Sequence, residues 1–276
     1  SDRAISQVLH GKGVRVVNVV PSQFAGRVMA DAAPHVGERC QLVSASKGIE
    51  TATLRRMDEV MMDVLGEERM KDFTVLSGPS FALEVAREAP TAVVAASVEA
   101  AAAARVQRLF QNRYFRVYTN PDVVGVELGG ALKNVIALAA GMSSGLGFGH
   151  NTLAALITRG LAEMARLGQA MGAQPTTFAG LAGMGDLVLT CTGELSRNRT
   201  VGVRLGRGES LASILREMSA VAEGVKTAQA AYDLAEREGV EMPITSEVRT
   251  VLVYGRDPRE ALWSLMERGP KPEEWS

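Results

Sequence analysis

The sequence predicts an α/β N-terminal half with a mostly parallel sheet, followed by an all-helical C-terminal half. Before residue 121, short β-branched runs alternate with helix-like segments, which is the pattern of strands joined by right-handed crossovers. From residue 124 onward, apolar residues recur at helical spacing without strand alternation. We place the boundary at Asn120-Pro121, which gives domains of residues 1–121 and 122–276.

Each expected strand is a short run rich in valine, threonine or aromatic residues that ends in a turn signal. These runs are residues 14–20, 41–45, 74–77, 91–96 and 115–118. Pro21 ends the first run, and Ser22 is placed to cap the next helix. The helices expected between the strands cover residues 50–65 and 98–110, and another opens at residues 78–80.

Glycine and proline separate the helices expected in the C-terminal half, which are residues 126–141, 152–171, 176–182, 199–205, 211–218, 226–238, 245–254 and 258–266. Residues 134–158 contain no Asp, Glu, Lys or Arg and are long enough to cross a bilayer. Their middle is rich in glycine, which breaks a helix and leaves polar groups unpaired in lipid. We therefore predict two buried helices joined by a loop, and no membrane span.

The composition, 46% hydrophobic and 22% charged, is that of a folded protein with a sizeable core. A formal net charge of -1 argues against nucleic acid as the partner, because phosphate binding needs a dominant basic surface. The two cysteines and three scattered histidines do not form a metal site. The polar N-terminus lacks the apolar stretch of a signal peptide, so we expect a cytoplasmic protein.

Lys133 is the most informative residue, because it is the one Asp, Glu, Lys or Arg between Glu127 and Arg159. Its helix is apolar on nearly every side, so the lysine is expected to be buried. Burial lowers the pKa of a lysine and suits it to proton transfer or to polarising a carbonyl. The alternative is a lysine whose ammonium reaches solvent along an apolar wall.

Three other segments place polar groups where a ligand could bind. In residues 183–199, two glycines precede Asp186, and residues 196–199 combine a hydroxyl, an amide and two guanidiniums, which suits phosphate. Lys47 follows an expected strand, and residues 78–80 join a strand to a helix, so both lie where open α/β sheets bind ligands. Each segment also has a simpler interpretation. Residues 196–199 could be a helix cap beside surface arginines, Lys47 a solvated loop lysine, and residues 78–80 a tight turn.

Several motifs together resemble the bacterial-type NAD(P)-dependent sn-glycerol-3-phosphate dehydrogenases. They include Val-Pro-Ser at residues 20–22, Ser-Lys-Gly at 46–48 and Ser-Gly-Pro-Ser-Phe-Ala at 77–82, and they continue at residues 115–122, 127–134, 183–192, 196–199, 222–224 and 241–245. The resemblance implies a Rossmann-like N-terminal domain, NAD or NADP as cofactor, and reversible reduction of dihydroxyacetone phosphate to sn-glycerol 3-phosphate, with a place in phospholipid synthesis.

The resemblance also implies roles for individual residues. Lys133 corresponds to the catalytic lysine. The substrate-binding residues would be Lys47, Gly78, Ser80, Asn134, Asp186, Thr190, Ser196, Arg197 and Asn198. The cofactor-binding residues would be Lys47, Ala82, Arg197, Val221 and Glu223. The partner is a small molecule, and the large helical half offers surfaces for a homodimer.

The sequence departs from the family pattern at its start, where it resembles a Rossmann-like domain lacking its first βαβ unit. No G-x-G-x-x-G follows the first expected strand, since Gly11-Lys12-Gly13 precedes that strand. Two alternatives therefore stay open: a 3-hydroxy acid dehydrogenase of similar build, and a catalytically incompetent fragment.

The mechanism implied by the resemblance makes a geometric prediction. Lys47, Lys133 and Arg197 should meet in one cleft between the two halves. Asp186 should lie within ion-pair reach of Lys133, because a buried ammonium without a partner is too costly.

Overall fold

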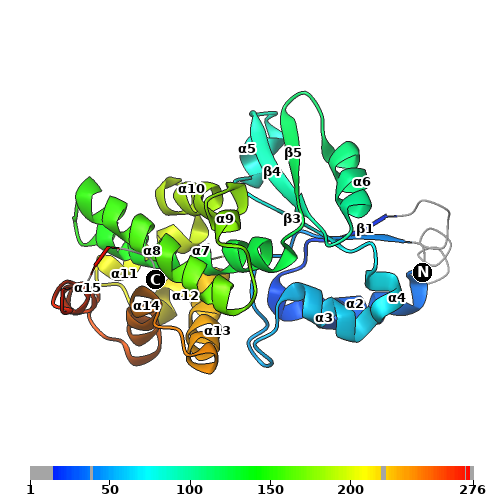
Figure 1. Ribbon diagram of the computed structural model, residues 1–276. Helices are drawn as coiled ribbons and strands as arrows, with labels where there is room; N and C mark the ends of the chain where they lie inside the picture. The colour runs from blue at the N-terminus through cyan, green and yellow to red at the C-terminus, as the bar shows by residue number, and fades with distance from the viewer. Residues whose placement is uncertain (1–14, 38–39, 219–221, 271, 274–276) are drawn as a thin grey trace.

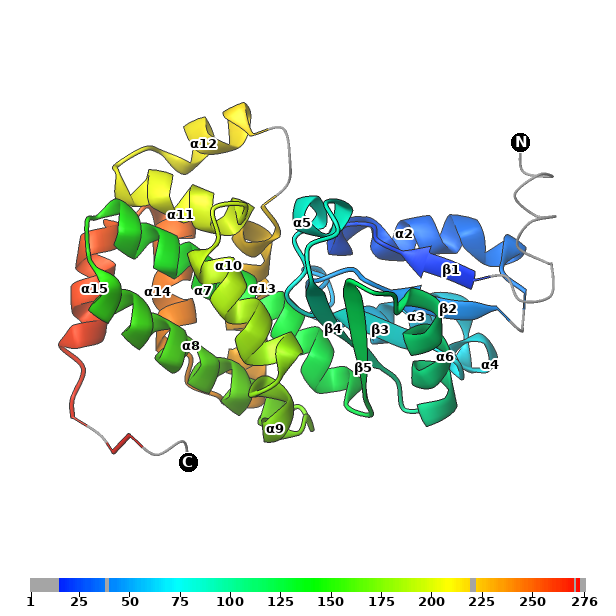
Figure 2. The ribbon, with the colours of Figure 1, turned by 90° about the horizontal axis from the view of Figure 1, so that it is seen from above.

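The computed structural model describes residues 15–37, 40–218, 222–270 and 272–273. An α/β half and a helical half lie side by side, as the sequence predicts (Figure 1). Seen from above, the sheet occupies one end of the molecule and α15 lies at the other end, beyond the remaining helices (Figure 2).

The sheet has five strands in the order β1-β2-β3-β4-β5. They are β1 (Arg15–Asn18), β2 (Gln41–Ser44), β3 (Thr74–Ser77), β4 (Thr91–Ala96) and β5 (Phe115–Asn120). Strands β1, β2 and β3 are parallel, β4 is antiparallel to β3, and β5 is parallel to β4. The carboxyl ends of β1, β2 and β3 therefore meet at one edge of the sheet, as expected.

Helices cover both faces of this sheet (Figure 1). One face packs against α2 (Ser22–Ala32), the short 3-10 turn η1 (Ala33–His35), α3 (Met57–Leu65) and α4 (Glu67–Met70), and the other packs against α6 (Ala100–Phe110). Neighbouring residues alternate between the two faces, so Leu42 joins the core under α2 and α3 whereas Val43 joins the core under α6. The short helix α5 (Ala82–Ala86) follows β3.

The helix expected over residues 50–65 is wrong at its start, because α3 begins only at Met57. Leu54 has a φ of 59°, in the left-handed region that interrupts a right-handed helix. Both carboxylate oxygens of Glu127 accept hydrogen bonds from the backbone N–H of Asp58, at 3.1 and 3.2 Å. A distant acidic side chain therefore satisfies the first turn of α3, and local periodicity could not reveal this.

The helical half is built around α7 (Val123–Gly145), which contacts most of the other helices. The others are α8 (His150–Ala170), α9 (Pro175–Phe178), α10 (Asp186–Thr192), α11 (Arg197–Gly206), α12 (Leu211–Glu217), α13 (Glu223–Glu238), α14 (Pro243–Tyr254) and α15 (Pro258–Met266). Helix α7 has the length and hydropathy of a membrane span, but 89% of its most apolar window is buried inside the protein. The predicted pair of buried helices joined by a glycine loop is therefore confirmed in α7 and α8.

Helices α7 and α11 approach each other through glycines. Gly141 and Gly145 of α7 face Gly202 and Gly206 of α11 so closely that a Cβ on any of the four would overlap backbone atoms of the other helix. Backbone therefore packs directly on backbone at this crossing, and the amino end of α11 is held beside the middle of α7.

Helix α10 was not predicted, because the glycines just before Asp186 interrupt a helical pattern. The turn η2 (Leu181–Gly185) instead has π-helical geometry and passes directly into α10, whose first residue is Asp186. Gly183 lies in this turn, where a Cβ would overlap the backbone of Phe178. The wide turn thus places the carboxylate of Asp186 against α7.

A buried carboxylate holds the start of α14. Glu163 of α8 is 2% exposed, and its oxygens accept hydrogen bonds from the backbone N–H groups of Ile244 (2.6 Å) and Thr245 (3.2 Å) and from the Thr245 hydroxyl (3.1 Å). Burial raises the pKa of Glu163 to about 7, although these hydrogen bonds and Arg166 oppose the shift.

The raised pKa of Glu163 predicts a pH-dependent stability. The folded state binds the proton more tightly than the unfolded state, whose pKa is near 4.5, so the free energy of unfolding should fall as pH rises from about 4.5 to about 7. The loss attributable to Glu163 should approach about 3 kcal/mol. Urea unfolding across this range should show the loss in the native chain and not in Glu163→Gln.

The exposed Glu236 on α13 provides the control, because Glu236→Gln should keep the pH dependence of the native chain. Parallel pH profiles for the native chain and Glu163→Gln would contradict the assignment.

Candidate active site

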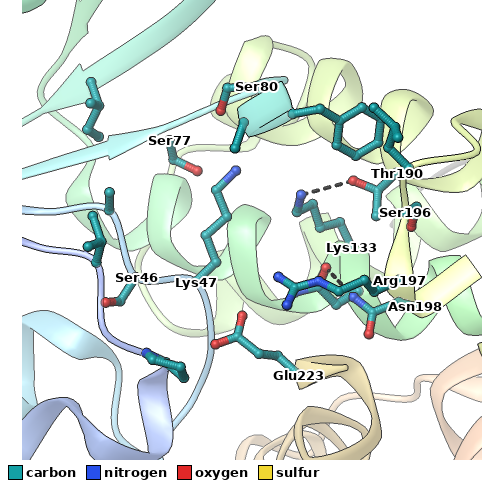
Figure 3. A pocket seen from close by; sticks show the side chains of 18 of the residues that line it. Ser46, Lys47, Ser77, Ser80, Lys133, Thr190, Ser196, Arg197, Asn198 and Glu223 are labelled. Carbon is teal, nitrogen blue, oxygen red and sulfur yellow. Dashed lines mark hydrogen bonds between the residues drawn. The ribbon is translucent and has the colours of Figure 1, made fainter. Parts of the chain in front are cut away.

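A cavity of about 680 Å³ opens where the carboxyl ends of β1, β2 and β3 face the helical half. Lys47 enters it from the sheet half, whereas Lys133 and Arg197 enter it from the helical half (Figure 3). The other polar side chains in its lining are Ser46, Ser77, Ser80, Asn134, Thr190, Ser196, Asn198 and Glu223. The predicted meeting of the three basic residues in one cleft is confirmed.

Asp186 lies beneath the cavity and pairs with both lysines. Its Oδ1 is 2.5 Å from Nζ of Lys133, and its Oδ2 is 2.6 Å from Nζ of Lys47. Lys133 also donates to the Thr190 hydroxyl at 2.9 Å, and Lys47 donates to the carbonyl of Gly78 at 3.0 Å. The predicted pairing of Asp186 with Lys133 is thus confirmed, and a second ammonium shares the same carboxylate.

Burial and charge act differently on the members of this cluster. Lys133 is 6% exposed, and burial followed by repulsion from Lys47 lowers its pKa to about 8, with Asp186 limiting the shift. Burial alone would raise the pKa of Asp186, but attraction to the two ammonium groups outweighs burial and lowers it. At neutral pH the cluster therefore holds one carboxylate and a protonated Lys133.

Two glycines give Lys47 its position. Gly78, whose carbonyl accepts from Lys47, has a φ of 133°, and a Cβ there would lie 3.0 Å from Cα of Val93. Gly130 of α7 faces Lys47, where a Cβ would lie 3.4 Å from the lysine Cγ and 3.0 Å from Oγ of Ser77. The side chain of Lys47 therefore passes between a strand end and a helix that both lack side chains at this point.

A second polar group forms the wall at the start of α11. Nδ2 of Asn198 donates to Oδ1 of Asn134 at 2.9 Å, and the backbone N–H of Gly224 donates to Oδ1 of Asn198 at 3.0 Å. Oγ of Ser196 accepts from the backbone N–H of Arg199 at 3.2 Å and so caps the helix. Arg197, the first residue of α11, is exposed toward the cavity.

Glu223 connects the two halves across the cavity. Its Oε1 accepts from the backbone N–H of Ser22, at the start of α2, at 3.3 Å. Burial raises the pKa of Glu223, whereas this hydrogen bond and the nearby Arg197 and lysines counter the shift. Val221, also expected near the cofactor, lies outside the described residues.

A polar link that was not predicted connects the end of β1 with the loop after β2. Nδ2 of Asn18 donates to Oγ of Ser46 at 3.0 Å, and Oγ of Ser46 donates to the carbonyl of Val20 at 2.5 Å. The sequence does contain an indication of this link, because Asn18 is a polar residue within a run of valines. Asn134, expected to bind substrate, accepts a hydrogen bond from Asn198 and donates one to the backbone carbonyl of Gly130 in its own helix.

Comparison with known proteins identifies the family. A model of the NAD-dependent glycerol-3-phosphate dehydrogenase N-terminus matches residues 4–103, and a model of the C-terminus of these enzymes matches residues 122–263. The chain is 62% identical over 272 residues to the glycerol-3-phosphate dehydrogenase (NAD(P)+) of Geobacter sulfurreducens, covering 99% of this chain and 81% of that protein. The chain belongs to this family.

Other glycerol-3-phosphate dehydrogenases are also similar to this chain in sequence and in structure. The enzyme of Geobacillus kaustophilus is 53% identical over 259 residues, covering 94% of this chain and 75% of that protein. The crystal structure of the Coxiella burnetii glycerol-3-phosphate dehydrogenase superposes with a TM-score of 0.88 at 38% identity, covering 92% of this chain and 77% of that one. The Rossmann-like domain with a helical partner, predicted from the motifs, is thus the fold of the family.

The shared carboxylate predicts a large stability effect for Asp186→Asn. The substitution leaves two ammonium groups, one of them buried, without a counter-charge, so the free energy of unfolding should fall by about 3–5 kcal/mol in urea titrations. Asp72→Asn is the matched control, because Asp72 pairs with Arg105 on the surface and its loss should cost about 1 kcal/mol or less. Equal losses in the two variants would contradict the role of Asp186.

Proposed function

We propose that this chain reversibly reduces dihydroxyacetone phosphate to sn-glycerol 3-phosphate with NADH or NADPH, in keeping with the name glycerol-3-phosphate dehydrogenase (NAD(P)+) that its relatives carry. The observation that carries the proposal is the cavity in which two ammonium groups share Asp186 beside the amino end of α11. In this proposal, residues 1–121 serve the cofactor and residues 122–276 provide most contacts to the substrate.

The sheet side of the cavity fits the nicotinamide end of the cofactor. Val19, after β1, is 70% exposed there, and the turn from Gly78 to Ala82 turns backbone toward the same space. In the described part of the chain, β1 passes through Pro21 into α2 without a glycine-rich turn, so we assign only this end of the cofactor to the cavity. Bound there, NADH or NADPH supplies the hydride for the substrate ketone.

Lys133 is proposed as the proton donor. Its pKa of about 8 keeps it protonated at neutral pH, yet close enough to neutrality to release the proton to a developing alkoxide. Asp186 and Thr190 hold the ammonium from one side, which leaves it directed at the cavity before the ketone arrives. In the reverse direction, neutral Lys133 accepts the proton from the substrate hydroxyl.

Lys47 and Asp186 complete the electrostatics of the ketone site. The ammonium of Lys47 adds positive charge beside the position where negative charge develops, which stabilises the transition state. Asp186 compensates part of this charge and keeps the two ammonium groups together despite their repulsion. Lys47 is therefore proposed to bind substrate and the nearby cofactor, and Asp186 to position both lysines.

The phosphate is proposed to bind at the start of α11. Arg197 offers a two-pronged guanidinium, Asn198 lies next to it in the cavity wall, and the amino end of a ten-residue helix favours an anion. Ser196 acts mainly through its cap of this helix. Gly78, Ser80, Asn134 and Thr190 are proposed to line the substrate, and Ala82 and Glu223 the cofactor.

The alternatives make different predictions for purified protein. A 3-hydroxy acid dehydrogenase would need a carboxylate clamp, whereas Arg197 at a helix start suits a doubly charged phosphate better. A fragment without activity would neither turn over nor bind reduced nicotinamide cofactor. Location in the cytoplasm and assembly as a homodimer stay predictions from the sequence.

Loss of the proton donor should lower the rate. Lys133→Met keeps most of the side-chain length but removes the proton, so kcat for ketone reduction should fall about 100-fold or more. With the native chain, kcat/KM for reduction should fall as pH rises through about 8, and that for oxidation should rise through the same range. Steady-state absorbance of the reduced cofactor measures both.

Lys226→Met, on the exposed surface of α13, is the control and should match the native rates. Near-native kcat in Lys133→Met would remove Lys133 from the mechanism.

Phosphate recognition should depend on the geometry of Arg197. Arg197→Lys keeps the charge but loses the two-pronged donor, so KM for dihydroxyacetone phosphate should rise about tenfold with little change in kcat. The native chain should use dihydroxyacetone and 3-hydroxyisobutyrate poorly. Arg207→Lys, at the other end of α11, should leave KM unchanged.

These assays also test the proposed function as a whole. Turnover of 3-hydroxyisobutyrate in preference to the phosphate substrate would favour the 3-hydroxy acid alternative. Absence of turnover together with absence of NADH and NADPH binding would favour the inactive fragment.

A further inference from the structure

A second hollow, of about 720 Å³, lies in the helical half. It is bounded by α8, the start of α14 and α15, and its lining shares no residue with that of the active-site cavity. Helix α15 lies at the end of the molecule away from the sheet (Figure 2). The proposed dehydrogenase reaction makes no use of this hollow.

The wall formed by α15 is apolar and open to solvent. Trp263 is 50% exposed and Met266 is 68% exposed, although both line the hollow beside Leu262. Phe148, on the loop before α8, closes one side and has the guanidinium of Arg259 5.5 Å from its ring centre. A concave apolar surface with an exposed tryptophan is typical of sites that bind the apolar part of a ligand.

The charged residues of the hollow are mainly basic. Arg159, Arg166 and Arg268 line it, and Glu163 is the one acidic residue in its described lining. The carboxylate of Glu163 is already engaged by the amides at the start of α14. The hollow therefore carries positive charge in a protein whose formal net charge is -1.

Arg159 differs from the other two arginines of the hollow because its guanidinium has no partner among the described residues. Arg268 pairs with the carboxylate of Glu241, and Arg166 donates to the Glu241 backbone carbonyl at 3.2 Å. Arg159 is half-buried on α8, and among the described residues no hydrogen bond or ion pair engages its guanidinium. A half-buried planar donor with unused hydrogen-bonding capacity is suited to a carboxylate.

We propose that this hollow binds a small amphiphile with a carboxylate head and an apolar chain. The carboxylate pairs with Arg159, and the chain lies against Trp263, Met266 and Phe148. The volume of about 720 Å³ is within the range of pockets for small organic ligands. Charge complementarity favours an anionic head group. Small polar anions such as inorganic phosphate should bind more weakly, because they leave the apolar wall uncovered.

Decanoate, below its micellar concentration, is the probe that tests this proposal. In a Trp275→Phe background, Trp263 is the one remaining tryptophan, so its fluorescence reports binding at the hollow, and calorimetry gives the affinity. Decanoate should bind and shift the Trp263 emission. Decan-1-ol and decyltrimethylammonium, which share the chain but lack the carboxylate, should bind at least tenfold more weakly.

Variants assign the head group and the wall. Arg159→Gln should weaken decanoate binding about tenfold or more, since a hydrogen-bonded charge is lost. Arg216→Gln, which removes the same charge from the exposed face of α12, should leave the affinity unchanged. Trp263→Ala, followed by calorimetry, should weaken decanoate and decan-1-ol alike.

Three results would overturn the proposal. They are equal binding of decanoate and decan-1-ol, unchanged affinity in Arg159→Gln, and absence of decanoate binding. In the last case, sedimentation experiments would show whether a second copy of the chain covers the hollow. The dehydrogenase assay is independent of all three, so failure here leaves the proposed function untouched.

Discussion

The arrangement of the active-site cavity depends on one carboxylate that neutralises two ammonium groups. Asp186 is 1% exposed, and neither Lys47 nor Lys133 has another acidic partner among the described residues. A buried charge is tolerated only when it is paired and hydrogen-bonded. The carboxylate and the two ammonium groups must therefore be buried next to one another. Because Lys47 lies in the loop after β2, Lys133 in α7 and Asp186 at the start of α10, this single requirement ties the sheet half to the helical half.

Backbone geometry and one polar side-chain contact meet this requirement. The π-helical turn η2 brings Asp186 against α7, and Gly130 leaves room for the stem of Lys47. The loop after β2 is held by the contact between Ser46 and Asn18. Each of these devices costs conformational freedom or helical regularity, and each lies within a few residues of the ion cluster, as expected where function sets the local structure.

The features that local physics decides could be predicted from the sequence. The burial of Lys133 follows from its apolar neighbours, and the need for a carboxylate follows from that burial. The features that distant residues decide could not be predicted. The start of α3 depends on Glu127, which lies 69 residues away from the amide it accepts from, and the sharing of Asp186 by Lys47 depends on how the two halves pack. Helix α10 was hidden because glycines before it resemble a loop.

The glycine crossing of α7 and α11 has a consequence for how evolution can alter this protein. Where two helices meet through side chains, compensating changes of size can shift one against the other. Where four glycines meet, no smaller residue exists, and any larger one separates the backbones by the thickness of a methyl group. The distance between the backbones of α7 and α11 at this crossing is therefore at its lower limit. Substitutions at these four positions can widen the crossing, but none of them can narrow it.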